Sequence, residues 1–246
     1  MTPPLVLLHA FPFDSRLFDP IRSAVAATVE LSTPDLRGFG AGPALGDPPP
    51  EPDLGLLADD CIAGLDATGI DRAIIGGVSM GGYVALALLR RHPERVAGLV
   101  LADTRSGPDD VAALDRRRVA AERADRGDIA SGADAIAPLI ADRTPPAVRA
   151  ELARIAGAVP PATIAWAQRA MAARPDSTVL LTTVRFPVLI VVGERDGITP
   201  PEVARQMAAV APGAELVELA QVGHLTPAED PTGFADALNG WLARRY

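Results

Sequence analysis

Ser79 lies in a pattern typical of a nucleophile. It is the central residue of Gly-Val-Ser-Met-Gly (residues 77–81), which follows an apolar run and precedes a helical pattern. On a tight turn from strand to helix, a serine hydroxyl projects above the sheet, and the free N–H groups that begin the helix face the same space. The motif therefore predicts a nucleophilic serine, with a glycine-rich structural turn as the alternative.

A serine nucleophile needs a general base, and the chain contains three histidines. His224 follows an apolar run, where open α/β sheets collect their functional residues. His92 precedes Pro93 at the end of a helical pattern and is interpreted as a helix-terminal residue. His9 is interpreted as a residue that shapes the loop after the first strand. We therefore predict that His224 is the base.

The histidine in turn needs a carboxylate that orients it. Two aspartates follow apolar runs, Asp103 and Asp196. Asp196 gives the chain order serine, aspartate, histidine, and a loop that leads into a helix follows it. The sequence therefore favours Asp196 as the acid, with Asp103 as its competitor and Glu194 as a weaker one.

Apolar runs that read as strands alternate with helical patterns along the chain. The expected strands are Leu5–Leu8, Thr28–Ser32, Ala73–Val78, Val96–Ala102, Val188–Val192 and Glu215–Leu219. The expected helices around them are Ser15–Ala27, Asp53–Ala67 with Asp53 as its N-cap, Met80–Arg91, Pro200–Val210 and Pro231–Arg244. This alternation predicts an α/β fold with a parallel sheet covered on both faces.

The alternation stops between the fourth and fifth strands. Residues 106–185 show helical spacing over Val111–Ala124, Ala133–Ile140, Ala147–Ala156 and Ala162–Ala173. We interpret this segment as a helical insertion, because a single crossover needs far fewer residues. A set of ordinary crossover helices is the alternative.

Composition excludes several functions. The formal charge of −8 argues against a nucleic-acid surface, which needs a basic patch. All 23 basic residues are arginine, so lysine-dependent chemistry such as a Schiff base is excluded. Cys61 is the only cysteine and is expected to be a buried structural thiol, so no cysteine zinc cluster is possible. We expect no metal, no membrane span and no targeting segment, and hence a cytoplasmic protein.

Several motifs, in this order, resemble the α/β-hydrolase fold family. They are His-Ala-Phe-Pro (9–12), Asp-Leu-Arg-Gly-Phe-Gly (35–40), Gly-Val-Ser-Met-Gly-Gly (77–82), Gly-Glu-Arg-Asp (193–196) and Gly-His (223–224). The resemblance covers almost the whole chain apart from the insertion.

The resemblance implies a mainly parallel six-stranded sheet in the order second, first, third, fourth, fifth, sixth. The family's first two strands are expected to be absent. Residues 1–105 and 186–246 would form the core, and residues 106–185 a helical cap over Ser79. The N–H groups of Phe11 and Met80 would form the oxyanion hole, although Ala10 stands where the family usually has glycine.

The function that the resemblance implies is a serine hydrolase for a small ester, lactone or related acyl compound. Within the family, the chain most resembles 3-oxoadipate enol-lactonase-like and esterase members. No cofactor is expected; the expected partner is a small-molecule substrate, and a homodimer is possible. Trp166, Leu139 and Leu225 are candidate substrate contacts, with burial in the core of the cap as the alternative for Trp166.

Other functions remain open at this stage. A cofactor-free haloperoxidase (perhydrolase) or a carbon–carbon bond hydrolase would use the same triad. A non-catalytic ligand sensor on the same fold is an alternative of a different class. A nicotinamide-dependent reductase is disfavoured, because the glycine-rich turn lacks the Gly-x-Gly-x-x-Gly spacing. Dehalogenases and epoxide hydrolases are disfavoured because they have aspartate at the position of Ser79.

Overall fold

Six parallel strands form one sheet in the order β2-β1-β3-β4-β5-β6. The computed structural model describes residues 2–246. The strands are β1 (Leu5–Leu8), β2 (Leu31–Ser32), β3 (Ala73–Val78), β4 (Val96–Ala102), β5 (Val188–Gly193) and β6 (Glu215–Leu219). The expected strand order is confirmed. The order reverses between β1 and β3, so the loops after these two strands open into one crevice.

Strand β2 is shorter than the expected Thr28–Ser32. The N–H groups of Thr28 and Val29 both donate to the carbonyl of Val25, at 2.9 and 3.1 Å, and so close a turn at the end of the preceding helix. These residues are therefore not free to pair with β1. The carbonyl of Glu30 still accepts from the Leu5 N–H at 2.8 Å, and the residues in register with β1 are Leu31 and Ser32.

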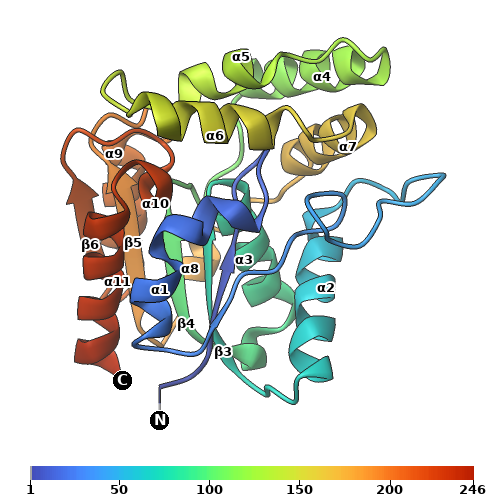
Figure 1. Cartoon of the computed structure of the whole chain (residues 1–246). Helices are drawn as coiled ribbons and strands as arrows, with labels where there is room; N and C mark the ends of the chain where they lie inside the picture. The colour runs from blue at the N-terminus through green and yellow to red at the C-terminus, as the bar shows by residue number, and fades with distance from the viewer. Residues whose placement is uncertain (1) are drawn as a thin grey trace.

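Helices cover both faces of the sheet (Figure 1). One face carries α1 (Asp19–Ala26), preceded by the short η1 (Ser15–Phe18), and α11 (Pro231–Arg245); the other carries α2 (Leu54–Ala67), α3 (Met80–Arg91) and α9 (Pro201–Val210). Side chains of each strand alternate between the two cores. In β1, for example, Val6 and Leu8 pack on the α3 side, whereas Leu5 and Leu7 pack on the α1 side.

The segment between β4 and β5 is helical, as expected. It forms α4 (Val111–Asp125), α5 (Gly132–Ile136), η3 (Ala137–Leu139), α6 (Pro146–Ala156), α7 (Pro161–Ala172) and α8 (Thr178–Thr182). Figure 1 shows α4, α5, α6 and α7 as a layer across one end of the sheet. The expected helix Ala133–Ile140 is split in two, because Pro138 cannot donate to a continuing α-helix. Helix α8 packs against α9 and so lies with the core.

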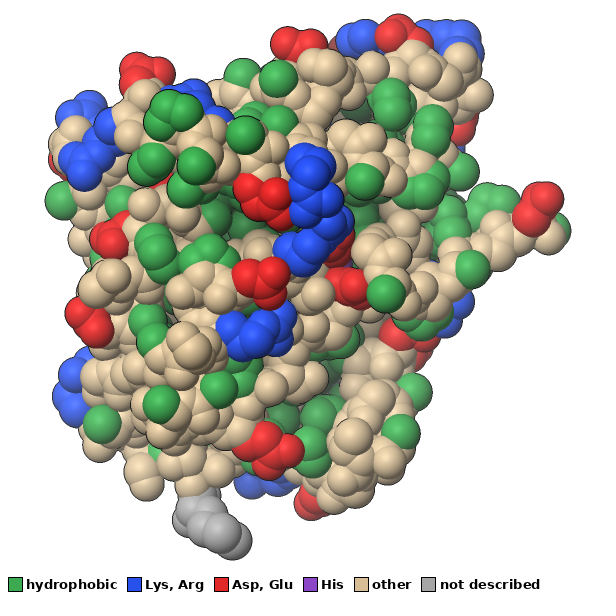
Figure 2. Space-filling view, in the orientation of Figure 1, with side chains coloured by type: hydrophobic (Ala, Val, Ile, Leu, Met, Phe, Trp, Pro, Cys, Tyr) green, Lys and Arg blue, Asp and Glu red, His purple; other side chains and the backbone are tan. Residues whose placement is uncertain are grey.

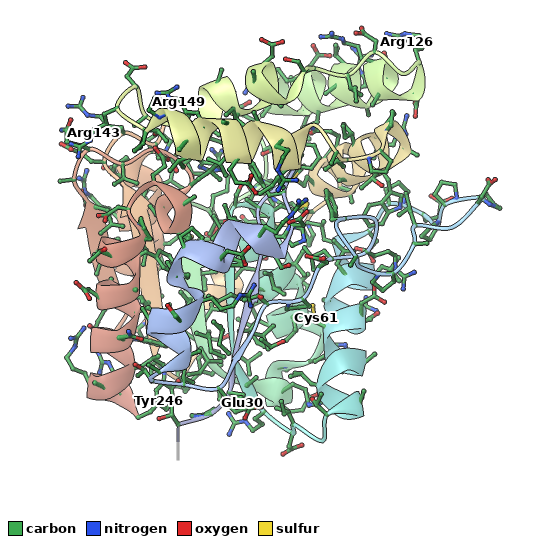
Figure 3. All side chains as sticks on the ribbon, in the orientation of Figure 1. Glu30, Cys61, Arg126, Arg143, Arg149 and Tyr246 are labelled. Atoms are coloured by element: carbon green, nitrogen blue, oxygen red, sulfur yellow. The ribbon has the colours of Figure 1, made fainter. Side chains whose placement is uncertain are left out.

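Some local expectations can be compared directly with the structure. Asp53 caps α2, and its carboxylate accepts from the Gly55 N–H at 2.8 Å. Cys61 is buried in α2 (Figure 3), and burial raises the pKa of its thiol to about 12. This thiol is therefore not a nucleophile at neutral pH.

On the face shown in Figure 2, basic side chains are interspersed with acidic ones. None of the helices within residues 2–246 is long and apolar enough to cross a membrane. In the same range, no cluster of three or more His, Cys, Asp or Glu side chains is arranged to hold a metal ion.

Candidate active site

Ser79 occupies a strained turn between β3 and α3. Its φ and ψ are 53° and −113°, a region that non-glycine residues seldom adopt. The turn is held from outside, since the Ser79 N–H donates to the carbonyl of Ala102 at 2.9 Å. The motif glycines are required by close packing: a Cβ on Gly77 would meet the Gly81 carbonyl carbon at 2.0 Å, and one on Gly81 would meet the Leu8 oxygen at 2.0 Å. Strand β3 and helix α3 therefore meet tightly enough to expose the serine hydroxyl.

The structure brings Ser79, His224 and Asp196 together. The Ser79 Oγ lies 2.8 Å from His224 Nε2, and His224 Nδ1 lies 2.7 Å from Asp196 Oδ2. An ionised carboxylate can only accept, so Nδ1 carries the proton and Nε2 accepts from the serine hydroxyl. Each group is therefore oriented as serine activation requires.

Asp196 is held by a dense set of donors. Its Oδ1 accepts from the N–H groups of Ile198 and Thr199, at 2.7 and 2.9 Å, and its Oδ2 accepts from the Thr199 hydroxyl at 2.7 Å. Burial alone would raise its pKa, but the hydrogen bond to His224 and these donors hold the pKa of Asp196 below its usual value. The carboxylate therefore remains ionised beside the imidazole at neutral pH.

Asp103, the competing acid, has a different set of partners. Its Oδ1 accepts from the Gly193 N–H at 3.0 Å, and its Oδ2 accepts from the Thr226 N–H and hydroxyl at 3.0 and 2.6 Å. Burial and the nearby charge of Asp196 raise the pKa of Asp103 well above its usual value. Asp103 therefore ties together the loops after β4, β5 and β6, and it makes no hydrogen bond to His224 within the described residues.

The loop after β1 faces the serine. Met80 begins α3, so its N–H has no partner within the helix, and Phe11 lines the cavity above Ser79. Ala10 is not among the described residues with positive φ, so this turn accommodates alanine without strain. His9 is buried, and burial lowers the pKa of its imidazole. Its Nε2 accepts from the Leu36 N–H at 3.0 Å, so the His9 side chain ties this loop to the segment that follows β2.

A cavity of about 390 Å³ lies between Ser79 and the helices α4 to α7. Its walls are mostly apolar and include Phe11, Pro12, Tyr83, Ala120, Ile129, Ala135, Pro138, Leu139, Ala156, Ile164, Met171 and Ile198. Leu139 lies in this lining, at the place expected of a substrate contact.

Trp166 and Leu225 do not line this cavity, in contrast to the expectation. Trp166 is 2% exposed, packs within the core, and its Nε1 donates to the Pro50 carbonyl at 2.8 Å. Leu225 is fully buried on the opposite face of the sheet, in the core that contains α11. Both side chains point into packed interior, which is why they are apolar.

Comparisons with known proteins identify the family. Residues 5–237 match the model of the alpha/beta hydrolase family. The chain belongs to this family. It is 31% identical over 229 residues to a pimeloyl-[acyl-carrier protein] methyl ester esterase of Neisseria meningitidis, which covers 89% of this chain and 84% of that protein.

Solved structures of the family have the same architecture. A thermophilic esterase from Thermogutta terrifontis, solved with malate bound, superimposes with a TM-score of 0.93 at 35% identity, covering 99% of this chain and 90% of that chain. The enol-lactonase from Burkholderia xenovorans superimposes with a TM-score of 0.88 at 24% identity, covering 99% and 92%. At that lower identity the enol-lactonase supports the fold alone.

The hydrolase cavity also contains charged groups that the sequence did not single out. Arg117 lines it and donates to the Gln168 amide oxygen at 3.0 Å and to Asp109. Arg123 lines it as well and pairs with Asp128 at 2.7 Å. Both arginines lie on α4, about 1.7 turns apart, and each is already paired with a nearby acidic side chain.

Glu229 is the functional candidate that the sequence did not reveal. Its Oε1 accepts from the Leu225 N–H at 3.1 Å, and its Oε2 accepts from the Ala141 N–H at 2.8 Å and the Thr144 hydroxyl at 2.6 Å. Beside it, the backbone N–H of His224 donates to the carbonyl of Leu139 at 2.8 Å. The loop that carries His224 is therefore fastened directly to the cap.

The same cap loop is supported from its other side by Arg149. Its guanidinium donates to the carbonyls of Ala141, Asp142 and Thr144, at 2.6 to 2.8 Å. Figure 3 shows Arg149 on α6 next to this loop, whereas Arg143 points away from the molecule. The loop is thus held between one carboxylate and one guanidinium.

We expect Glu229→Gln to lower kcat by about 10- to 100-fold, because a displacement of a reacting group by about 1 Å can cost about 100-fold. The glutamine amide would face N–H donors on both sides and loosen the His224 loop from the cap. Steady-state kinetics on an ester should show the loss in kcat with little change in KM. Glu94→Gln, on an exposed glutamate, is the control. A lowered melting temperature with an unchanged kcat would assign Glu229 to stability alone.

Proposed function

We propose that this protein is a serine hydrolase that cleaves small carboxylic esters or lactones through an acyl-enzyme. The observation that carries the proposal is the continuous hydrogen-bonded chain from Ser79 through His224 to Asp196, at 2.8 and 2.7 Å. This chain ends in a cavity large enough for a small molecule.

In the proposed reaction, the Ser79 Oγ attacks the ester carbonyl while His224 Nε2 takes the serine proton. The N–H groups of Phe11 and Met80 stabilise the oxyanion that forms. His224 then gives the proton to the leaving alcohol, and the acyl group remains on Ser79. A water molecule, deprotonated by His224, then attacks this acyl-enzyme, and His224 returns the proton to the Ser79 Oγ as the acid is released. Asp196 stabilises the imidazolium in both halves of the reaction.

The cavity supports a compact substrate with an apolar acyl or alcohol part. Its walls are mostly apolar. Apart from Ser79, His224 and Tyr83 of α3, its polar side chains belong to residues 117–134 and to Gln168 of α7. Two of the relatives described above are named for ester hydrolysis, one as a methyl ester esterase and one as a thermophilic esterase. A short ester or a lactone fits the lining, and an ester also fits these names.

A panel of substrates tests the proposal. We expect turnover of p-nitrophenyl acetate, p-nitrophenyl butyrate and a δ-lactone by the wild type, and none above background by Ser79→Ala run in parallel. The same panel with hydrogen peroxide and bromide tests for perhydrolysis. No turnover of any ester or lactone would contradict the proposal and favour a carbon–carbon bond substrate or a ligand sensor.

A further inference from the structure

A second cavity, of about 230 Å³, lies outside the catalytic cavity, next to α2 and α3. It is located where the two linkers join the cap to the core: one contributes Arg105 and Ser106, the other Arg174 and Ser177. The linkers are tied together, since the Ser177 N–H donates to the Ser106 carbonyl at 2.9 Å. We name this space the hinge cavity. Of the described residues, Tyr83 alone lines both cavities.

The hinge cavity concentrates positive charge. Its lining carries four guanidinium groups and one carboxylate, those of Arg90, Arg91, Arg105, Arg174 and Asp53. Arg91 and Arg174 are paired with aspartates outside the lining, and Asp53 caps α2. Arg90 and Arg105 donate to carbonyl or hydroxyl oxygens, and neither forms an ion pair with a carboxylate within residues 2–246. This excess is notable in a chain whose net charge is −8.

Two of these guanidinium groups have buried donors without a partner. The Nε atoms of Arg105 and Arg174 are inaccessible to solvent and make no hydrogen bond. The Arg174 side chain is only 6% exposed and lies 4.1 Å from the centroid of the Tyr83 ring, so it is fixed in place. Buried donors without a partner are uncommon in proteins, because they lose hydration without compensation. These Nε atoms are closed off from the cavity as well as from bulk solvent, so a bound acceptor would meet the Nη groups of the lining arginines.

We propose that the hinge cavity is a binding site for a small organic carboxylate, separate from the catalytic cavity. A carboxylate has only acceptors and matches the planar guanidinium of Arg105. The lining also has an apolar part, made of Leu54, Leu86, Ala87 and Pro175, which suits a short hydrocarbon body. Inorganic phosphate would leave this wall uncovered, and the four guanidinium groups repel a metal cation.

Arg105 connects this site to the catalytic acid. Its Nη2 donates to the carbonyl of Ile198 at 2.6 Å, and the Ile198 N–H donates to Asp196 Oδ1 at 2.7 Å. A carboxylate bound to Arg105 would therefore contact a side chain that also supports the Asp196 loop. Arg105 would thus contribute both to binding in the hinge cavity and to the position of the Asp196 carboxylate.

Calorimetric titration of the whole protein with butyrate tests the proposal. Ala87→Leu fills the hinge cavity and keeps its arginines, and Arg105→Gln removes a charge and keeps the space. We expect each to weaken butyrate binding at least about tenfold, as the loss of a charge-assisted hydrogen bond does. n-Butanol, which lacks the carboxylate, should bind the wild type more weakly by a similar factor.

Two matched variants locate the binding. Ala120→Leu fills the catalytic cavity from another helix, and Arg126→Gln removes an arginine at the outer end of α4, far from the hinge (Figure 3). Both should leave the butyrate affinity within about twofold, as for substitutions outside a site. Loss of affinity in Ala120→Leu with retention in Ala87→Leu would place butyrate in the catalytic cavity and overturn the proposal. Absence of binding to the wild type, or equal binding of butyrate and inorganic phosphate, would also overturn it.

Discussion

Replacing Ser79 with alanine is expected to lower kcat toward the best ester by about 10⁵-fold or more, which is the scale for removal of a serine nucleophile. The Ser79 Oγ lies 2.8 Å from His224 Nε2. The alanine variant lacks this oxygen, so His224 has no hydroxyl to deprotonate there. Steady-state kinetics at high enzyme concentration measure the residual rate. The N–H groups of Phe11 and Met80 remain in the variant, so the residual rate measures the contribution that we propose for them.

A fluorophosphonate probe separates loss of the nucleophile from loss of fold. The chain has seven serines, and we expect modification of Ser79 alone, located by peptide mass spectrometry. The Ser79→Ala protein should melt near the wild-type temperature, because the serine side chain contributes one hydrogen bond and the backbone of the turn is held by other contacts. Labelling of another serine in active enzyme, or activity retained in the variant, would place the nucleophile elsewhere.

The sequence was sufficient for those parts of the site that lie at the ends of strands. The loops that carry Ser79, Asp196 and His224 each follow a β-branched or apolar run. Because parallel strands share one carboxyl edge, local patterns were enough to bring these residues together. The strand order, in contrast, was predicted from the resemblance to the family and not from local patterns.

The sequence was insufficient where contacts between distant parts of the chain determine the position of a side chain. Helical spacing shows that Trp166 shares an apolar face, but not that the loop at Pro50 covers it, 116 residues earlier in the chain. Glu229 likewise finds its partners 85 and 88 residues away in the cap. Helices α8 and α10 (Thr226–Glu229) are too short to produce a periodic signal in the sequence. The position of α10 depends on distant contacts, such as the hydrogen bond from the Thr226 hydroxyl to Asp103.

The second large effect is expected from Asp196→Asn, which should lower kcat by about 10³- to 10⁴-fold through the wrong histidine tautomer. The N–H groups of Ile198 and Thr199 both donate to Oδ1, so the amide oxygen of asparagine must take that position. The amide NH₂ then faces His224 Nδ1, which can accept only if the ring proton moves to Nε2. An Nε2–H cannot take the proton of Ser79. Kinetics over a pH series measure the loss.

Asp103→Asn is the control that decides between the two acids. Every donor to Asp103 comes from Gly193 or Thr226, so its replacement disturbs the connection between loops without changing the tautomer of His224. We therefore expect Asp103→Asn to lower the melting temperature while kcat falls by far less than in Asp196→Asn. Because the pKa of Asp103 is raised by burial and by the charge of Asp196, a neutral side chain is also tolerated at position 103 better than at position 196. The opposite ranking of the two variants in kcat would mean that the acid which orients His224 belongs to the loop after β4.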